Sequence, residues 1–562
     1  MASVADHLVA RLAADGIDHV FGVGGANIED VFDSLHRLGP RPRLVLAKHE
    51  FGAATMADGY ARTTGRYGVV LATSGGGALN LVAALGESFA SRVPVLALVG
   101  QPPTALEGRG AFQDTSGRAG TIDAQMLFGQ VSRFCARVDD PAGFPELLAD
   151  ALAAVAEGGP AVLLLPKDIQ QTEARAPRTG SDRRPSEPDG HDANGIRSAN
   201  PKPADHSRAD HARAEHLVVE SAAGTVVIIA GAEIARADAR AELSALAVAL
   251  DAAVVVAPDA KDVFPNAHPL YAGVAGIMGH PGIAALIADA ALCLVVGTPL
   301  PTTERGGLES ALAQTTVLHL GIDAPFVAAA ASVSGELRKN LARLTAAAPP
   351  RASRARRIDA GSLEPPSATG AGIRYRQAVS AIAARLAPGD GVFADAGNTG
   401  AAVIHHLPVP EDGLFVVALG MGGMGYAFGA GIGSALGRGR RTYVLAGDGS
   451  FLMHGFEVHT AAEYQAPVTF VVFNNNAHAM CVTREQLYYS GDYTFNRFAP
   501  SDPAAAIDAL LPGITARSAS TLAELERALD ETAAIPGPVF VCIDCDPDEI
   551  PPFAPFLEEF SA

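Results

Sequence analysis

Short apolar runs alternate with helix-length stretches along most of the chain. In the first 170 residues, strand-like runs begin at His19, Leu44, Gly68, Pro94 and Ala161. Alternation of this kind is typical of parallel strands that are covered by helices on both faces. The pattern therefore predicts a doubly wound α/β domain over residues 1–170.

The same alternation returns twice, each time after a stretch of different composition. Residues 171–216 are rich in Arg, Asp, His, Pro and Ser, and residues 346–371 contain two Pro-Pro pairs, so both stretches are predicted to be linkers. Later strand-like runs begin at Thr225, Ala253, Ala291, Val317, Gly391, Leu414, Thr442, Val468 and Val539. We expect three consecutive doubly wound parallel-sheet domains, at 1–170, 217–345 and 372–550, and a tail at 551–562.

The composition is that of a well-buried globular protein. Of its 562 residues, 48% are hydrophobic and 18% charged, and the net charge of −19 argues against nucleic acid or an anionic membrane as a partner. Five cysteines are too few for a disulfide scaffold. The start, Met1-Ala-Ser-Val-Ala-Asp-His, lacks the features of a signal peptide, so we expect a cytoplasmic protein.

One uncharged segment is long enough to span a bilayer. Residues 414–437 carry no charge but contain eight glycines, which makes them a poor isolated helix. Gly-rich helices also occur where two backbones pack closely. We therefore expect a buried helix here and no membrane span.

The most specific chemical signal is Gly447-Asp448-Gly449, followed after 24 residues by Asn474-Asn475. The spacing places Asp448 and Asn475 at the carboxyl ends of two neighbouring parallel strands, with a predicted helix from Phe451 to Tyr464 between them. Ligands bind at this edge of such a sheet. The two glycines let the backbone approach a phosphate, the helix N-terminus favours an anion, and the Asp and Asn oxygens suit Mg²⁺.

These residues resemble those of the thiamine-diphosphate enzymes, in particular the acetolactate synthase and pyruvate oxidase group, and the resemblance covers nearly the whole chain. It implies Mg²⁺ ligands at Asp448, Asn475 and the carbonyl of Ala477. It also names the three domains in order: aminopyrimidine-binding, central and diphosphate-binding. Cofactor contacts are implied at Gly397, Asn398, Thr399, Gly447, Gly449, Ser450, Ala477, His478, Ala479 and Met480.

Thiamine catalysis also needs a carboxyl group against the far nitrogen of the aminopyrimidine ring, so that the cofactor's amino group can remove the proton from C2. Glu50 follows a predicted strand and starts a predicted helix, which places a carboxylate at a sheet edge; an acid favoured there by the helix dipole is the structural alternative. The string KHEFGAATMADGYAR is similar to the glutamate motif of the family. The resemblance therefore assigns Glu50 this role.

A large apolar side chain is needed to hold the cofactor bent. Met424 lies in the glycine-rich Gly422-Gly-Met-Gly-Tyr and matches the family's position for this side chain. The resemblance implies further contacts from Gly422. In the first domain, Gly25 and the run from Thr73 to Asn80 resemble the loops that lie against the aminopyrimidine. Gly76 stands where many relatives have Pro.

Phe112 and Gln113 indicate which type of reaction the resemblance implies. Simple decarboxylases of the family often carry a His pair near the reacting carbon, whereas acetolactate synthases carry Phe-Gln. A neutral amide can hold a carbonyl acceptor without readily protonating the reacting carbon. We expect a 2-oxo acid carboligase, with a small-molecule 2-oxo acid donor and a carbonyl acceptor. The alternatives are a non-condensing 2-oxo acid decarboxylase or lyase, and a non-catalytic cofactor-binding subunit.

Two features depart from the synthase pattern. The chain has no Trp, and Arg484 stands where the synthases have a Trp that limits acceptor size. Arg484 either grips a second anionic group of a substrate or is neutralised by Glu485 or another acid. Second, Gly297-Thr-Pro replaces the Gly-Ala-Arg of flavin-binding members, although Gly273–His280 resembles their other loop; FAD is possible. The resemblance finally implies a homodimer or homotetramer, with Glu50 and Asp448 contributed by opposite subunits.

Overall fold

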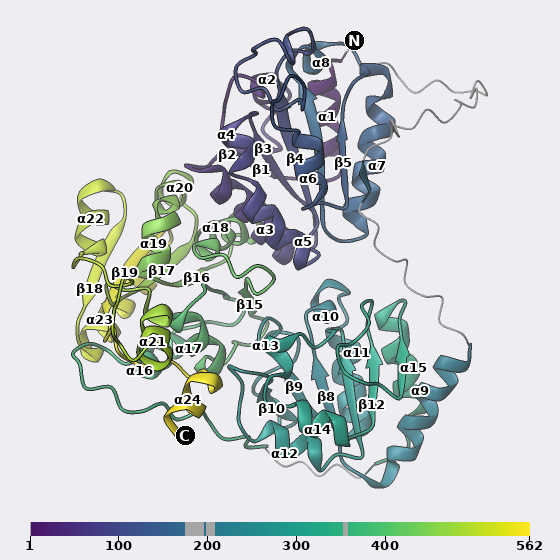
Figure 1. The fold of residues 1–562 in the computed structure, drawn as a ribbon, viewed down its shortest axis with the longest axis vertical. Helices are drawn as coiled ribbons and strands as arrows, with labels where there is room; N and C mark the ends of the chain where they lie inside the picture. Colours follow the sequence, from purple (N-terminus) through teal and green to yellow (C-terminus); the bar gives the residue numbers. More distant parts are fainter. Residues whose placement is uncertain (1, 175–195, 198–207, 352–357, 562) are drawn as a thin grey trace.

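The computed structural model describes residues 2–174, 196–197, 208–351 and 358–561, and it contains three sheets, each with helices on both faces (Figure 1). The three doubly wound parallel sheets expected from the alternating pattern are confirmed. Each sheet has six parallel strands, and the first has a seventh, two-residue strand that is antiparallel.

The first sheet has the strand order β2-β1-β3-β4-β6-β5-β7. Its strands are β1 (His19–Gly22), β2 (Arg43–Leu46), β3 (Gly68–Ala72), β4 (Val95–Gln101), β5 (Phe134–Arg137), β6 (Pro160–Pro166) and β7 (Ile196–Arg197). Its helices are α1 (Val4–Ala14), α2 (Glu29–Arg37), α3 (Glu50–Thr64), α4 (Gly76–Leu79), α5 (Val82–Ala90), α6 (Ala124–Gly129), α7 (Phe144–Ala156) and α8 (Lys167–Gln171).

The central sheet has the order β10-β9-β8-β11-β12-β13. Its strands are β8 (Val226–Ala230), β9 (Ala253–Val256), β10 (Tyr271–Val274), β11 (Leu292–Val296), β12 (Val317–Leu320) and β13 (Ala331–Val333). Its helices are α9 (Arg208–Glu220), α10 (Glu233–Arg236), α11 (Arg240–Leu250), α12 (Ile283–Ala288), α13 (Thr302–Arg305), α14 (Glu309–Gln314) and α15 (Leu337–Ala347).

The third sheet has the order β15-β14-β16-β17-β19-β18. Its strands are β14 (Gly391–Ala394), β15 (Leu414–Val417), β16 (Thr442–Gly447), β17 (Val468–Asn474), β18 (Thr515–Ala519) and β19 (Val539–Asp544). Its helices are α16 (Tyr375–Ala383), α17 (Asn398–His406), α18 (Tyr426–Arg438), α19 (Asp448–His454), α20 (Val458–Tyr464), α21 (Ala479–Tyr488), α22 (Pro503–Leu510), α23 (Leu522–Ala533) and α24 (Ala554–Ser561).

Several details differ from the sequence-based expectation. Helix α9 begins at Arg208, inside the stretch predicted to be a linker, and most of that stretch (175–195 and 198–207) lies outside the described residues. The single helix expected from Phe451 to Tyr464 is two helices, α19 and α20, joined by a 3₁₀ turn at Gly455–Glu457. A glycine at the joint favours such a break, because it weakens a continuous helix.

The uncharged segment 414–437 consists of β15, a loop and α18. In the part of the chain that the structure describes, no helix is long and apolar enough to cross a membrane. Helix α18 instead packs along α3, so that the first and third sheets share one buried core that includes Phe21, Ala54, Phe428 and Phe470 (Figure 1).

Glycines bring α3 and α18 into backbone contact. A Cβ atom added at Gly59 would lie 2.0 Å from the carbonyl oxygen of Ala430, and one at Gly433 would lie 1.9 Å from that of Met56. Both distances are too short for any side chain. Gly433 of α18 and Gly59 of α3 are therefore explained by helix–helix packing between the first and third sheets.

Candidate active site

The Gly-Asp-Gly motif and the Asn pair meet at one edge of the third sheet. Strands β16 and β17 are parallel, with Gly447 opposite Phe473 in register. Asp448, the first residue of α19, and Asn475 therefore follow directly at the carboxyl ends of neighbouring strands. This is the edge at which α/β sheets bind their ligands.

Asp448 is a buried carboxylate that lacks a full set of partners. Its exposed fraction is 1%, and its Oδ2 atom has no hydrogen-bond partner among the described residues. Burial raises the pKa of Asp448 to about 6, although nearby backbone N–H groups favour the ionised form. A buried acceptor without a donor is costly unless a cation or another ligand binds it. This oxygen fits a metal ion.

Asn475 and the segment after it supply further oxygen atoms. The Asn475 side chain donates to the Tyr375 hydroxyl (3.1 Å), and its Oδ1 atom accepts from the N–H of Ala477 (3.0 Å). Within the described ranges, no group of three or more His, Cys, Asp or Glu side chains could hold a metal. A metal at Asp448 would therefore be held by a mixed set of carboxylate, amide and carbonyl oxygens, which is the set that suits Mg²⁺.

Space for an anion lies beside Asp448. Gly397, with φ of 95°, precedes α17, and a Cβ added there would meet nothing within 4 Å. The neighbouring Asn398 side-chain oxygen and the His478 Nδ1 atom are both buried without a hydrogen-bond partner in the described chain. Thr399 is buried next to Gly447. The N-terminus of α17 thus borders open space, and helix N-termini favour anions such as a diphosphate.

The remaining predicted contacts lie around this space. Ser450 is buried in α19, and a Cβ added at Gly449 would lie 2.6 Å from His478 Nδ1. Ala479 and Met480 form the first turn of α21, directly after His478. All of these residues belong to the third sheet and its helices.

Glu50 forms the other half of the candidate site, at the edge of the first sheet. It is the first residue of α3, where the His49 side chain accepts the N–H of Phe51. Asn80 donates to Glu50 Oε2 (2.9 Å). A Cβ added at Gly77 would lie 2.8 Å from Glu50 Oε1, so the absence of a side chain there leaves room for the carboxylate.

Thr73 connects Glu50's surroundings to Gln113. The Thr73 hydroxyl donates to Gln113 Oε1 (3.3 Å), and Gln113 adopts a left-handed backbone conformation with φ of 58°. Gly25 lies against Thr73, with 2.6 Å between the Thr73 Cβ and a Cβ added at position 25. Phe112, by contrast, is 79% exposed. The structure brings Gly25, Thr73 and Gln113 together but leaves Phe112 outside this group.

The first and third sheets contact each other where α3 begins. The Phe51 ring stacks on His454 with 4.1 Å between ring centroids, and a Cβ added at Gly425 would lie 2.6 Å from the same His454 ring. Met424 lies next in the chain, and its Cε atom approaches Gly449. A cavity of about 380 Å³ at this junction is lined by residues of both halves, among them Phe51, Val82, Met421, Gly423 and Tyr426.

Asp395 was not predicted from the sequence, and it is a fully buried carboxylate that follows β14. Its oxygens accept from the N–H groups of Gly425 (2.9 Å) and Ala427 (2.9 Å) and from the Ser450 hydroxyl (2.7 Å). Burial raises the pKa of Asp395 despite these donors. Asp395 therefore fixes the end of the Met424 loop, defined here as residues 418–425, to α19. An Asp directly after a strand was the available signal.

Glu457 was also missed. It lies in the 3₁₀ turn after α19, is 2% exposed, and accepts from the N–H groups of Lys48 (3.0 Å) and His49 (3.0 Å). Burial raises the pKa of this carboxyl. A carboxylate from a turn beside the third sheet thus holds the backbone just before Glu50. Nothing in the sequence indicated this contact, because its partners are more than 400 residues away.

Arg484 lies on the exposed side of α21 and has no ion-pair partner among the described residues. The neighbouring Glu485 does not neutralise it. The Glu485 carboxylate is buried and accepts from Asn496 Nδ2 (2.6 Å) instead. Helix α21 turns the Arg484 side chain outward.

The loops considered for flavin are occupied by protein contacts. His280 Nδ1 accepts the N–H of Val274 (3.0 Å), and its ring stacks on His405 at 4.7 Å, which joins the central sheet to the third. The Thr298 hydroxyl donates to buried Glu304 (2.5 Å). These polar groups bind one another, and nothing in their arrangement calls for FAD.

Three domain descriptions match this chain in the order of its sheets. They are "Thiamine pyrophosphate enzyme, N-terminal TPP binding domain" for residues 2–119, the central domain of the same enzymes for residues 219–344, and their C-terminal TPP binding domain for residues 395–543. The chain belongs to the thiamine pyrophosphate enzyme family, and the resemblance stated from the sequence motifs is confirmed.

Relatives that match this chain over most of its length have names that include acetolactate synthase. The chain is 27% identical to a protein named "Probable acetolactate synthase large subunit" of Methanocaldococcus jannaschii, over 98% of this chain and 93% of the relative. It is 28% identical to acetolactate synthase isozyme 3 large subunit of Escherichia coli, over 88% and 86% of the two chains. It is also 28% identical to the acetolactate synthase large subunit of Corynebacterium glutamicum, over 87% of this chain and 77% of the relative.

The site geometry predicts the effect of removing the Asp448 carboxylate. Asp448→Ala should lose Mg²⁺-dependent binding of thiamine diphosphate, because a divalent ion without its carboxylate bridges the diphosphate poorly. Calorimetric titration of the cofactor with and without Mg²⁺ measures this.

Asp544→Ala is the matched control, because Asp544 ends β19 at the same sheet edge but is exposed. It should bind the cofactor as the wild type does. Wild-type affinity in Asp448→Ala would show that the metal lies elsewhere.

Proposed function

We propose that this protein is a thiamine-diphosphate- and Mg²⁺-dependent 2-oxo acid carboligase that resembles acetolactate synthase. It would decarboxylate a 2-oxo acid and join the remaining acyl carbon to a carbonyl acceptor. The observation that carries the proposal is the presence of two half-sites in the chain: a buried, incompletely bonded Asp448 at an edge of the third sheet, and Glu50 held by Asn80 at an edge of the first. Family membership and the named relatives support it.

Thiamine diphosphate, when bound, supplies the carbon centre that adds to the 2-oxo acid and stabilises the charge left by departing CO₂. The oxygens of Asp448 and Asn475 and the Ala477 carbonyl would hold Mg²⁺. Glu50 would present its carboxyl group to the aminopyrimidine ring and hold a proton there. Asn80 keeps that carboxyl group in place through its 2.9 Å hydrogen bond.

Met424 would support the bent cofactor from its glycine-rich loop. The contacts assigned to Gly25, Thr73, Gly397–Thr399, Gly422, Gly447–Ser450 and residues 477–480 belong to this proposal as well. Gln113 would hold the acceptor carbonyl with its amide, and its bond from Thr73 (3.3 Å) orients it toward Glu50's surroundings. A neutral amide favours ligation over protonation of the reacting carbon. Flavin has no part in the proposed function.

We further propose that each sheet is the core of one domain, with the limits 1–170, 217–345 and 372–550. The active unit is a homo-oligomer with the cofactor at a subunit interface, and the protein is cytoplasmic. Support for a reducing location comes from five free cysteines, four of them buried. Support for an oligomer comes from family resemblance and from large exposed apolar side chains on segments near the site, including Phe112, Met421 and Phe456.

Products identify the reaction. Mass spectrometry of mixtures with a panel of 2-oxo acids, with and without aldehyde or ketone acceptors, should reveal a 2-hydroxyketone, or a 2-hydroxy-3-oxo acid where a second 2-oxo acid is the acceptor. Release of CO₂ with only an aldehyde would favour the non-condensing decarboxylase. A chain without turnover or C2-proton exchange of the cofactor would instead be a non-catalytic subunit.

Glu50→Gln should stay folded but lose turnover, because an amide cannot hold the proton that the aminopyrimidine requires. Exchange of the cofactor's C2 proton for deuterium, followed by NMR after acid quench, should slow by about 10²–10⁴-fold. Unchanged exchange would remove Glu50 from the proposed role.

Mixing two inactive variants tests the shared site. Glu50→Gln and Asp448→Ala proteins, combined under conditions that exchange subunits, should regain part of the activity if Glu50 and Asp448 act across an interface. Native mass spectrometry confirms the exchange. If mixed oligomers form and activity stays absent, each chain builds its site from its own α3 and α19, which already meet through Phe51 and His454 in the single chain.

Arg484 supports a more specific proposal about the substrates, in which one substrate carries a second anionic group. Its guanidinium is exposed and has no ion-pair partner among the described residues, on a helix that begins at the candidate cofactor site. Such a group can bind a carboxylate or phosphate through two parallel hydrogen bonds. A dicarboxylic 2-oxo acid or a phosphorylated acceptor would fit. A lyase acting on such a substrate is the second candidate.

Arg484→Trp should weaken use of the anionic substrate by about 1.5–3 kcal/mol of transition-state stabilisation, the size of a hydrogen bond to a charged group. Preference should shift toward small neutral-chain substrates such as pyruvate. The measurement is kcat/KM for matched anionic and neutral substrates in both proteins. An equal change for both classes would leave Arg484 without a role in selectivity.

A further inference from the structure

The Met424 loop has little packing of its own. Residues 420–423 are exposed, three of the loop's last four residues are glycines, and a Cβ added at Gly422 or Gly423 would meet nothing within 4 Å. Gly422 and Gly425 both have positive φ, at 66° and 86°. A loop of this composition has many accessible conformations. Its shape must therefore be imposed by contacts at its ends.

Asp395 fixes one end of the loop, and a first-sheet carboxylate holds the other. Glu87 lies in α5 and is 3% exposed. Its Oε2 atom accepts the N–H of Met421 (2.6 Å), and its Oε1 atom lies 3.2 Å from the N–H of Gly420. Both oxygens of a buried acid thus bind consecutive backbone amides of the third sheet's loop. Hydrogen bonds from backbone N–H groups to a carboxylate are among the stronger ones in proteins.

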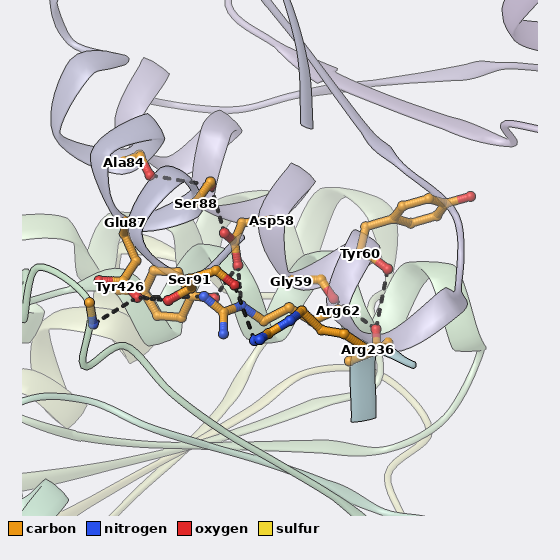
Figure 2. Close-up of polar contacts among 12 residues, drawn as sticks. Asp58, Gly59, Tyr60, Arg62, Ala84, Glu87, Ser88, Ser91, Arg236 and Tyr426 are labelled. Atoms are coloured by element: carbon orange, nitrogen blue, oxygen red, sulfur yellow. Dashed lines mark hydrogen bonds and ion pairs between the residues drawn. The ribbon is translucent and has the colours of Figure 1, made fainter. Parts of the chain in front are cut away.

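The carboxylate of Glu87 is itself held by neighbours on the first sheet. The Ser91 hydroxyl donates to Oε1 (2.7 Å), and an Arg62 nitrogen lies 3.5 Å away. Arg62 also binds Asp58 (2.6 Å), which in turn accepts from the Tyr426 hydroxyl at the start of α18. Figure 2 shows Asp58, Arg62, Glu87 and Tyr426 side by side at this contact.

We propose that Glu87 is a positioning residue that sets the conformation of the Met424 loop from the first sheet, and so places Met424 against the cofactor. The proposal rests on the proposed function, in which Met424 supports the bent cofactor. Glu87 touches neither cofactor nor substrate. It acts through the N–H groups of Gly420 and Met421, and it makes loop geometry depend on the contact between α3, α5 and α18.

Glu87→Gln tests the proposed role of Glu87 without changing the size of the side chain. The amide can accept one N–H but presents its own NH₂ to the other, and it loses the charge that Arg62 faces. Misplacing a group by about 1 Å costs up to about 10²-fold in rate, so C2-proton exchange of bound cofactor should slow by about 10- to 10²-fold. The KM for the 2-oxo acid and the affinity for thiamine diphosphate should remain close to wild type, because Asp448 is untouched.

Amide hydrogen exchange of residues 418–428, followed by mass spectrometry of the holoenzyme, should accelerate at the loop while α5 and α18 keep their protection. Glu87→Asp is the second variant, for use if Glu87→Gln does not fold. It keeps the charge, but its oxygens stand one methylene short of the loop amides, so it should show the same loop and C2-exchange effects.

Glu233→Gln is the matched control, since Glu233 is a buried acid of the central sheet that accepts the N–H of Ile322 (3.0 Å). It should leave C2 exchange unchanged. Wild-type C2 exchange and wild-type loop protection in a folded Glu87 variant would overturn the proposal. An absence of C2 exchange in the wild-type protein would overturn the proposed function itself.

Discussion

The contact between α3 and α18 is the constraint on which the candidate site depends. Gly59, Gly429 and Gly433 let the two backbones touch, and a Cβ at any of them would overlap Ala430, Thr55 or Met56. Because Glu50 begins α3 and the Met424 loop precedes α18, the packing of these helices decides where both are placed. The apolar core shared by the first and third sheets stabilises the same contact.

Buried carboxylates fix the conformation of the segments next to these two helices. Asp395 holds the start of α18, Glu457 holds the backbone before Glu50, and Glu87 holds the start of the Met424 loop. In each case a carboxylate accepts backbone N–H groups of a segment from another element. Burying these charges is unfavourable by itself, but satisfied N–H donors offset the cost. Asp448 differs, since one of its oxygens is left for a ligand.

Much of the fold could be predicted because strand and helix patterns are local. The parallel strands with long apolar runs, such as β4, β6 and β17, were visible in the sequence. Strands β5, β10, β13 and β18 were not, because each contains a glycine, polar or charged residue that interrupts the apolar run. Their strand conformation depends on pairing with neighbours, and a single-sequence pattern carries no information about pairing.

The sequence by itself determined the class of chemistry. The spacing of Asp448 and Asn475, the Glu50 motif and the Gly-rich run around Met424 are local patterns, and they indicated a thiamine diphosphate enzyme without any coordinates. Only the tertiary structure decided which distant groups support them. Glu457 lies 409 residues from Lys48 and Glu87 lies 334 residues from Met421, so these hydrogen bonds exist only once the first and third sheets have packed. The outward position of Arg484 and the separate partners of Glu485 were decided in the same way, by the direction in which α21 faces after folding.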